Sequence, residues 1–205
     1  MASQIALFTS LAILWAVTTA FLWRGRRWLM FYLTGAFGFV LLVVYGASLA
    51  GYDTWLETIE AVQVTALAAQ IGLRLDILGT SGLAIPNHTG WAVFDIGIEC
   101  SALLEMSAIV GLAAFYPAFS AGRKAYTILV GVGVTYVINL LRILLIVAII
   151  NALGTSWVFP AHAVFGRVFF FAGTVALYWY IITRPTISVV NRRLSPVVDE
   201  VNADE

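Results

Sequence analysis

The chain has 205 residues, of which 61% are hydrophobic and 11% are charged, and its formal net charge is zero. Soluble domains contain about 25% charged residues, so this composition predicts an integral membrane protein and excludes an ordinary soluble domain. The charge balance provides no basic surface for nucleic acid. The single cysteine, Cys100, cannot form an internal disulfide. Taken alone, such a residue is more often a packed apolar side chain than a reactive thiol.

Five apolar segments have about the length needed to cross a membrane, which is ~20 residues for ~30 Å of hydrocarbon. They cover residues 5–23, 28–50, 100–119, 125–150 and 163–183. No positively charged region precedes the first segment, as a cleaved signal peptide would require. We therefore expect one integral membrane domain over residues 1–184, followed by a polar cytoplasmic tail over residues 185–205.

The segment 52–73 differs from these five because it is both helical in pattern and polar. An apolar stripe that includes Trp55 and Val62 alternates with carboxylates such as Glu57 and Glu60. This pattern predicts an amphipathic helix that lies in the membrane interface. Further on, turn residues 86–90 separate two short apolar runs and predict a hairpin-like loop. The predicted fold class is all-α: a polytopic transmembrane bundle with about five spanning helices, one interfacial helix and an outer hairpin-like loop.

Basic residues flank alternate connecting regions. Eight of them lie near the first turn, the turn after the third apolar segment and the C-terminal end: Arg24, Arg26, Arg27, Arg123, Lys124, Arg184, Arg192 and Arg193. The other two connecting regions, 51–99 and 151–161, contain only Arg74. The positive-inside rule therefore predicts a cytoplasmic C-terminus, with the N-terminus and the 51–99 loop outside. If segment 52–73 crossed the membrane, the Arg123–Lys124 turn would fall outside, so parity also favours the interfacial interpretation.

Ionisable side chains inside apolar segments usually face the bundle interior and mark function. The third segment begins with Cys100, the fourth carries Arg142, and His162 stands at the start of the fifth. Arg142 precedes the outer end of its segment by eight residues, which is ~12 Å at 1.5 Å per residue. The predicted topology therefore brings a thiol, a guanidinium group and an imidazole into the same leaflet, beneath the 51–99 loop. Arg167 we expect to pair with a carboxylate or to extend toward the interface.

These three groups suit cysteine acyl transfer. A thiolate is the nucleophile in such reactions and needs a nearby base, a role that His162 can fill. The same imidazole can return the proton to a leaving amine. A fixed cation such as Arg142 can stabilise the oxyanion of a tetrahedral intermediate. Asn139 and Asn151 are the candidates for orienting the imidazole.

Two other interpretations remain open from the residues alone. Arg142 and Glu105 could form a structural ion pair, with Asn139 hydrogen-bonded to the arginine one turn away, in a non-enzymatic transport or assembly subunit. Alternatively, His88, Cys100 and His162 could bind Zn²⁺ in a membrane hydrolase. We expect no metal and no other cofactor.

Three sequence motifs resemble those of the exosortase/archaeosortase family. They are Glu99-Cys100-Ser101-Ala102-Leu103-Leu104, Asn139-Leu140-Leu141-Arg142-Ile143 and His162-Ala163-Val164-Phe165-Gly166. Their order and spacing match, as do the preceding interfacial helix and loop, and the resemblance covers residues 55–184. It implies a membrane-embedded cysteine transpeptidase in which Cys100 is the nucleophile, His162 the acid and base, and Arg142 the stabiliser, with Glu99, Ser101, Glu105 and Asn139 in support.

The resemblance also implies a substrate class. Members are thought to process secreted proteins that carry a C-terminal sorting signal, made of a short motif, a hydrophobic helix and a basic cluster. The implied partners are therefore such proteins and the lipid bilayer, with an amine or water as the final acceptor. One position departs from the family: many members have glycine after the Cys-Ser pair, where this chain has Ala102. The extra methyl group puts substrate choice in question more than mechanism.

Overall fold

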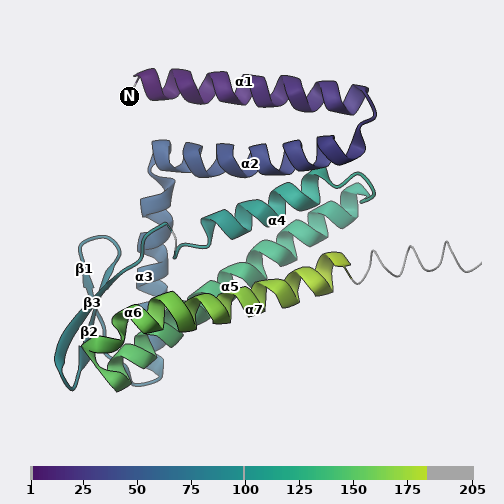
Figure 1. Cartoon of the computed structure of the whole chain (residues 1–205). Coiled ribbons are helices and arrows are strands. Elements are labelled where there is room, and N and C mark those ends of the chain that lie inside the picture. The colour runs from purple at the N-terminus through teal and green to yellow at the C-terminus, as the bar shows by residue number, and fades with distance from the viewer. Residues whose placement is uncertain (1, 99, 184–205) are drawn as a thin grey trace, which may run out of the picture.

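The computed structural model describes residues 2–98 and 100–183. Helices α1 (Ala2–Arg24) and α2 (Trp28–Ala50) form an antiparallel pair, and α3 (Tyr52–Gln70) then turns across their direction (Figure 1). The elements that follow in the chain are β1 (Asp76–Leu78), β2 (Gly82–Asn87), β3 (Gly90–Asp95), α4 (Leu103–Phe115), α5 (Ala121–Leu153), η1 (Thr155–Trp157), α6 (Val158–Pro160), η2 (Ala161–Gly166), α7 (Arg167–Tyr178) and η3 (Trp179–Thr183).

The predicted all-α membrane bundle is confirmed. Among the described residues, four helices are long and apolar enough to cross a membrane: α1, α2, α5 and the continuous stretch Thr155–Ile181. The third predicted segment folds as the shorter helix α4, whose 13 residues reach only about 20 Å. The helix begins late because Cys100 to Ala102 form a turn, and it ends before Pro117, whose ring disfavours helical geometry in the residue before it. It still packs between α2 and α5.

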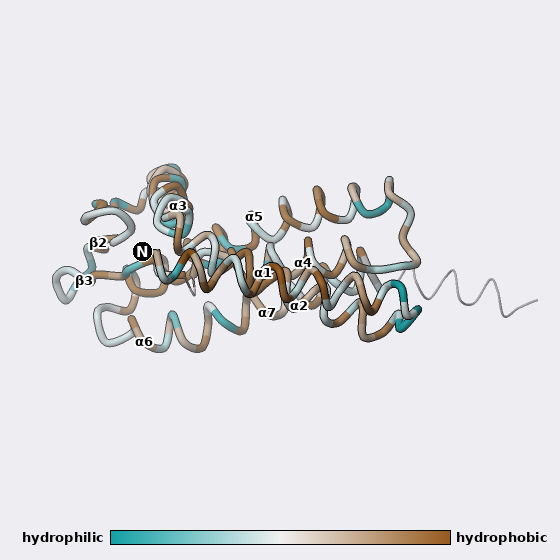
Figure 2. The backbone as a smooth tube through the Cα atoms, turned by 90° about the horizontal axis from the view of Figure 1, so that it is seen from above, coloured by the Kyte–Doolittle hydropathy of each residue, from teal (hydrophilic) through white to brown (hydrophobic). Residues whose placement is uncertain are grey.

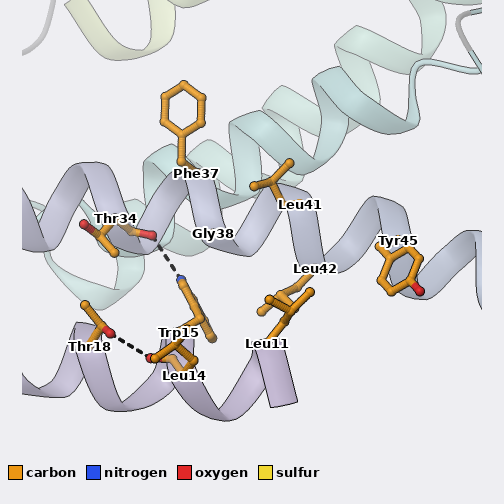
Figure 3. A pocket seen from close by; sticks show the side chains of 10 residues that line it. All are labelled: Leu11, Leu14, Trp15, Thr18, Thr34, Phe37, Gly38, Leu41, Leu42 and Tyr45. Atoms are coloured by element: carbon orange, nitrogen blue, oxygen red, sulfur yellow. Dashed lines mark hydrogen bonds between the residues drawn. The ribbon is translucent and has the colours of Figure 1, made fainter. Parts of the chain in front are cut away.

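Helix α1 packs closely on α2 because a glycine stands at the crossing. The indole N–H of Trp15 donates a hydrogen bond of 3.0 Å to the carbonyl of Thr34. A Cβ atom added at Gly38 would lie 2.0 Å from the Trp15 ring, so the indole occupies the space that any larger residue would need. Figure 3 shows the Trp15–Thr34 hydrogen bond. It lies beside an apolar groove of about 550 Å³, whose lining includes Leu11 and Phe37.

The expected interfacial helix and hairpin are both present. Helix α3 runs across the spanning helices, and its apolar stripe faces outward, with Trp55 61% and Val62 53% exposed. Its carboxylate face turns into the protein, where Glu60 is fully buried. The hairpin is formed by β2 and β3, which pair in antiparallel register from Gly82 opposite Asp95 to Asn87 opposite Gly90, and β1 adds a third strand.

The two ends of the bundle differ in chemistry. The α1–α2 turn, which contains Arg27, and the N-terminal end of α5, which contains Lys124, lie at one end. The sheet, α3 and the N-terminal end of α1 lie at the other (Figure 1). Figure 2 shows hydrophobic residues along the spanning helices and hydrophilic ones gathered at the ends. The main buried apolar cluster lies at the sheet end, where β2, β3, α3, α5 and η2 meet. Helix α5 extends into this cluster, and Asn151 donates a hydrogen bond of 2.6 Å to the carbonyl of Pro86 in β2.

Candidate active site

Cys100 lies in a tight turn between β3 and α4. Its backbone N–H donates a hydrogen bond of 2.7 Å to the carbonyl of Gly97, and the Ser101 hydroxyl donates one of 3.1 Å to the carbonyl of Ile98. Ala102 then adopts the left-handed conformation, with φ at +51°, and caps α4. These bonds hold Cys100 in a fixed position with only 2% of its surface exposed. Glu99 lies outside the described residues.

His162 approaches the thiol from the other side of the bundle's end. The Cys100 Sγ and the His162 Nδ1 are 3.6 Å apart, which is hydrogen-bonding range for sulfur. The imidazole belongs to η2, a π-helical turn that follows Pro160, and such turns redirect side chains at many functional sites. The ring of Phe94 packs against it, with centroids 5.5 Å apart. The structure thus brings together the thiol and the imidazole that the sequence analysis singled out.

A cavity of about 660 Å³ opens onto this pair. Strand β3 and the Gly97–Ile98 turn line one side, and residues of η1 and α6, including Ser156 and Phe159, line the other. Cys100 and His162 both contribute to its wall, so Cys100 is largely buried in the fold and yet lines an open cavity.

Arg142 lies on α5 and is 4% exposed. Its Cζ atom sits 5.2 Å from the centroid of the Phe170 ring, in range of a cation–π interaction. A second cavity, of about 360 Å³, is lined by Arg142, Glu105 and Arg167, among others, and shares Ile98 with the first. The cavity that Arg142 lines therefore adjoins the cavity of the Cys–His pair at Ile98, while the pairing of Arg142 with Glu105 stays a prediction.

Asn139 and Glu60 form a buried link to the Cys100 backbone. The Asn139 amide donates one hydrogen bond of 2.6 Å to the carbonyl of Cys100 and another of 3.1 Å to Oε1 of Glu60. Both side chains are fully buried. Burial raises the pKa of Glu60 to about 8, against the opposing effects of the Asn139 hydrogen bond and the Arg142 charge. Glu60 is therefore largely neutral at pH 7 in this position.

Glu60 was not among the residues that the sequence analysis assigned to the site. Its helix was identified as interfacial, and a carboxylate on the polar face of such a helix is normally solvated. The signal that could have found it was Asn139, because a buried amide inside a spanning helix needs partners from other segments. Asn139 was predicted to orient His162 or to contact Arg142, whereas its amide nitrogen bonds the Cys100 carbonyl and Glu60.

The proposed zinc ligands do not form a metal site in the described part of the chain. No group of three or more His, Cys, Asp and Glu side chains in residues 2–98 and 100–183 is arranged to hold a metal ion. His88 lies instead in the β2–β3 turn, against Gly154.

A thiol and an imidazole in contact, held beneath a small sheet at one end of a helical membrane bundle, define a membrane protein with a candidate cysteine-type active site. The family comparison agrees with this class. The model of the transmembrane exosortase family matches residues 1–179, so the chain belongs to the transmembrane exosortases. Searches among curated proteins and among solved structures returned no match.

The left-handed Ala102 gives a stability prediction. A residue with a Cβ atom pays about 1–2 kcal/mol in this conformation, whereas glycine adopts it freely. We expect Ala102→Gly to raise the stability of the detergent-solubilised protein by about 1 kcal/mol and Ala102→Val to lower it, measured by thermal unfolding. If Ala102→Gly is no more stable than the parent, the turn is not strained at this residue.

Glu60 gives a pH prediction. Its pKa is about 8 in the folded protein and near 4.5 in the unfolded chain, so between these values the folded state holds more protons. Its contribution to stability is therefore full below about pH 4.5 and is lost as the pH rises toward 8. We expect Glu60→Gln, which keeps the acceptor for Asn139, to flatten the fall in unfolding temperature between pH 5 and pH 8.

Glu60→Leu serves as the matched control. It removes the acceptor and leaves an Asn139 N–H unpaired, a loss of about 1–3 kcal/mol at every pH. The assignment is wrong if the Gln variant shows the parent's pH dependence.

Proposed function

We propose that this exosortase is a membrane-embedded cysteine transpeptidase or protease that cleaves a C-terminal sorting signal from secreted proteins. The observation that carries the proposal is the 3.6 Å separation of Cys100 Sγ and His162 Nδ1 at the wall of an open cavity. A nucleophile and its base within hydrogen-bonding reach are the minimal requirement for covalent acyl transfer.

The proposed reaction has two halves. Nδ1 of His162 takes the thiol proton, and the Cys100 sulfur attacks the scissile carbonyl carbon, which moves the carbonyl π electrons onto oxygen. The tetrahedral intermediate collapses as the C–N bond breaks, and the imidazolium gives its proton to the leaving amine. An acyl thioester then remains on Cys100. An acceptor amine or water attacks it, gives its proton to His162 and releases the product with the thiol restored.

Arg142 is proposed to stabilise the developing negative charge. It is buried, and the cavity that it lines shares Ile98 with the cavity of the Cys–His pair. A fixed cation in such a place acts with less screening than in water. The proposed substrate is a secreted protein held by its C-terminal hydrophobic helix. That helix would enter laterally from the bilayer and present the bond just above it to Cys100. Glu105, Ser101 and Glu99 are supporting residues in this proposal.

The proposed location is the cell membrane, with the active site outside and the C-terminus in the cytoplasm. The α1–α2 turn, with Arg26 and Arg27, and the N-terminal end of α5, with Arg123 and Lys124, lie at one end of the bundle. Strand β3 and helix α6, which directly precede the segments that carry Cys100 and His162, lie toward the other (Figure 1). Basic turns favour the cytoplasmic side of a membrane.

Processing of a substrate tests the function directly. The assay uses membranes containing the protein and a secreted protein of the same cell that ends in a hydrophobic helix and a basic cluster. Cys100→Ala should abolish processing, and His162→Ala should slow it by at least about 10²-fold because the acid and base are lost. Intact-mass measurement should find the acyl product on Cys100 in the parent. Normal processing by Cys100→Ala would refute the proposal.

Arg142→Lys separates catalysis from structural pairing. Lysine keeps the charge but loses the planar fork, so an arginine that only neutralises Glu105 should be replaceable. A stabilising role predicts normal protein levels with turnover reduced by about 10²–10³-fold. The double variant Glu105→Gln/Arg142→Gln should recover protein level relative to Arg142→Gln, because no charge is left unpaired, and should stay inactive. An active, well-expressed double variant would exclude Arg142 from catalysis.

The proposed orientation is tested by reporter fusions after residues 90 and 200. A reporter active only outside the cytoplasm should work at residue 90 and fail at residue 200, as the distribution of basic residues requires. Equal reporter activity at both positions would contradict the orientation.

A further inference from the structure

Strand β3 is an edge strand that runs toward the candidate nucleophile. The sheet order is β1-β2-β3, so only one side of β3 is paired. Ile96, just beyond the strand, donates a hydrogen bond of 3.2 Å to the carbonyl of Ser81 on the β2 side. Since antiparallel pairs alternate, the N–H and C=O groups of Val93 and Asp95 point away from β2. Within the described residues, no backbone hydrogen bond joins β3 to a segment on its far side.

The open edge faces the cavity that contains the Cys–His pair. Val93 and Asp95 line this cavity, and the η1–α6 segment forms the wall opposite them. The hairpin turn is fixed to that wall, because the Thr155 backbone N–H donates a hydrogen bond of 3.1 Å to the Thr89 hydroxyl. The space is therefore bounded by the Thr89–Thr155 contact, the strand edge and the opposite wall, with Cys100 and His162 exposed to it.

The direction of β3 matches that of a substrate peptide that leads into a membrane helix. β3 leads through the Cys100 turn into α4, which runs from the sheet end toward the opposite end of the bundle (Figure 1). In the substrate, an extended segment leads to the scissile bond and then to a hydrophobic helix, just as β3 leads to the Cys100 turn and then to α4. It would therefore run parallel to β3.

We propose that the substrate binds by strand addition: the extended segment that precedes its hydrophobic helix pairs in parallel with the open edge of β3. Val93 and Asp95 each offer one donor and one acceptor to it, and main-chain pairing of this kind is largely independent of sequence. Side chains of the added strand alternate between its two faces, so selectivity falls on every second residue. This inference rests on the proposed function and assigns its substrate-binding surface.

A series of peptide probes tests this mode of binding. The parent probe is acetyl-tetra-alanine ending in a vinyl sulfone. The Cys100 thiolate adds to the vinyl carbon β to the sulfonyl group, the C–S bond forms as the C=C π bond breaks, and the carbon next to the sulfonyl group takes a proton. Four further probes carry N-methylalanine at one position each, which removes one N–H. The rate of Cys100 modification by each probe is measured on the full-length protein in nanodiscs and divided by the rate with methyl vinyl sulfone, which reports thiol reactivity alone.

Strand addition predicts that sensitivity to N-methylation alternates along the probe. Methylation at alternate positions should reduce the normalised rate about tenfold, as expected for one lost hydrogen bond, with much smaller effects between them. Equal sensitivity at all four positions, or none, would overturn the proposal.

Two proline variants test the strand itself. Val93→Pro removes an N–H that faces the cavity, and proline is tolerated where an edge strand's N–H points away from its sheet. It should lower the normalised rate of the parent probe about tenfold. Trp91→Pro is the matched control: its N–H also points away from β2, but Trp91 does not line the cavity. Equal rates for the two variants would contradict the assignment.

The probe series also separates this inference from the function on which it rests. If methyl vinyl sulfone fails to modify Cys100 in the parent protein, the nucleophile assignment and the binding mode both fail. If it reacts and the peptide series shows no alternation, only strand addition is wrong.

Discussion

The two hydrogen bonds donated by Asn139 hold the site together. One fixes the carbonyl of Cys100, and the other fixes Glu60 on α3, so one amide joins three segments that are far apart in sequence. These groups are buried, and a buried polar group that lacks its hydrogen bond costs about 1–3 kcal/mol of stability. The position of the thiol therefore depends on α3 lying across the end of the bundle. The Tyr136 hydroxyl adds a second link between α5 and α3, with a hydrogen bond of 2.8 Å to Gln63.

Departures from regular backbone geometry gather around the same point. Ala102 is left-handed immediately after the Cys100 turn, and η2 is π-helical where it carries His162. These departures lie beside the two candidate catalytic side chains, whose Sγ and Nδ1 atoms are 3.6 Å apart. Conformations of this kind persist only where the surrounding structure enforces them, and they concentrate at functional sites.

Much of the architecture follows from the sequence because the bilayer restricts the choices. Uninterrupted apolar stretches predict α1, α2 and α5, and the turn residues around His88 predict the hairpin. The pairing of Cys100 with His162 followed from the alternation of basic residues, which sets the direction of each helix.

The features that the sequence does not predict depend on contacts between segments that are distant along the chain. Glu60 is a buried partner of Asn139, although on its own helix it has the pattern of a solvated residue. The shortness of α4 depends on the Cys100 turn, and hydropathy does not reveal a turn made of the small residues Cys100, Ser101 and Ala102. The role of Arg142 and the orientation in the membrane stay predictions.

The short helix α4 also has a consequence for hydrophobic matching. Its 13 residues span about 20 Å, whereas the hydrocarbon layer is ~30 Å thick. Where α4 lines the bundle, the bilayer must thin or water must enter to about one third of its depth. The thiol just before α4 would then lie below the surrounding lipid surface and still be wetted. In the proposed reaction, a substrate helix as short as α4 would bring its outer end level with the thiol. A helix of full length would have to tilt or unwind several residues, so the enzyme would select substrates by the thickness of membrane they need.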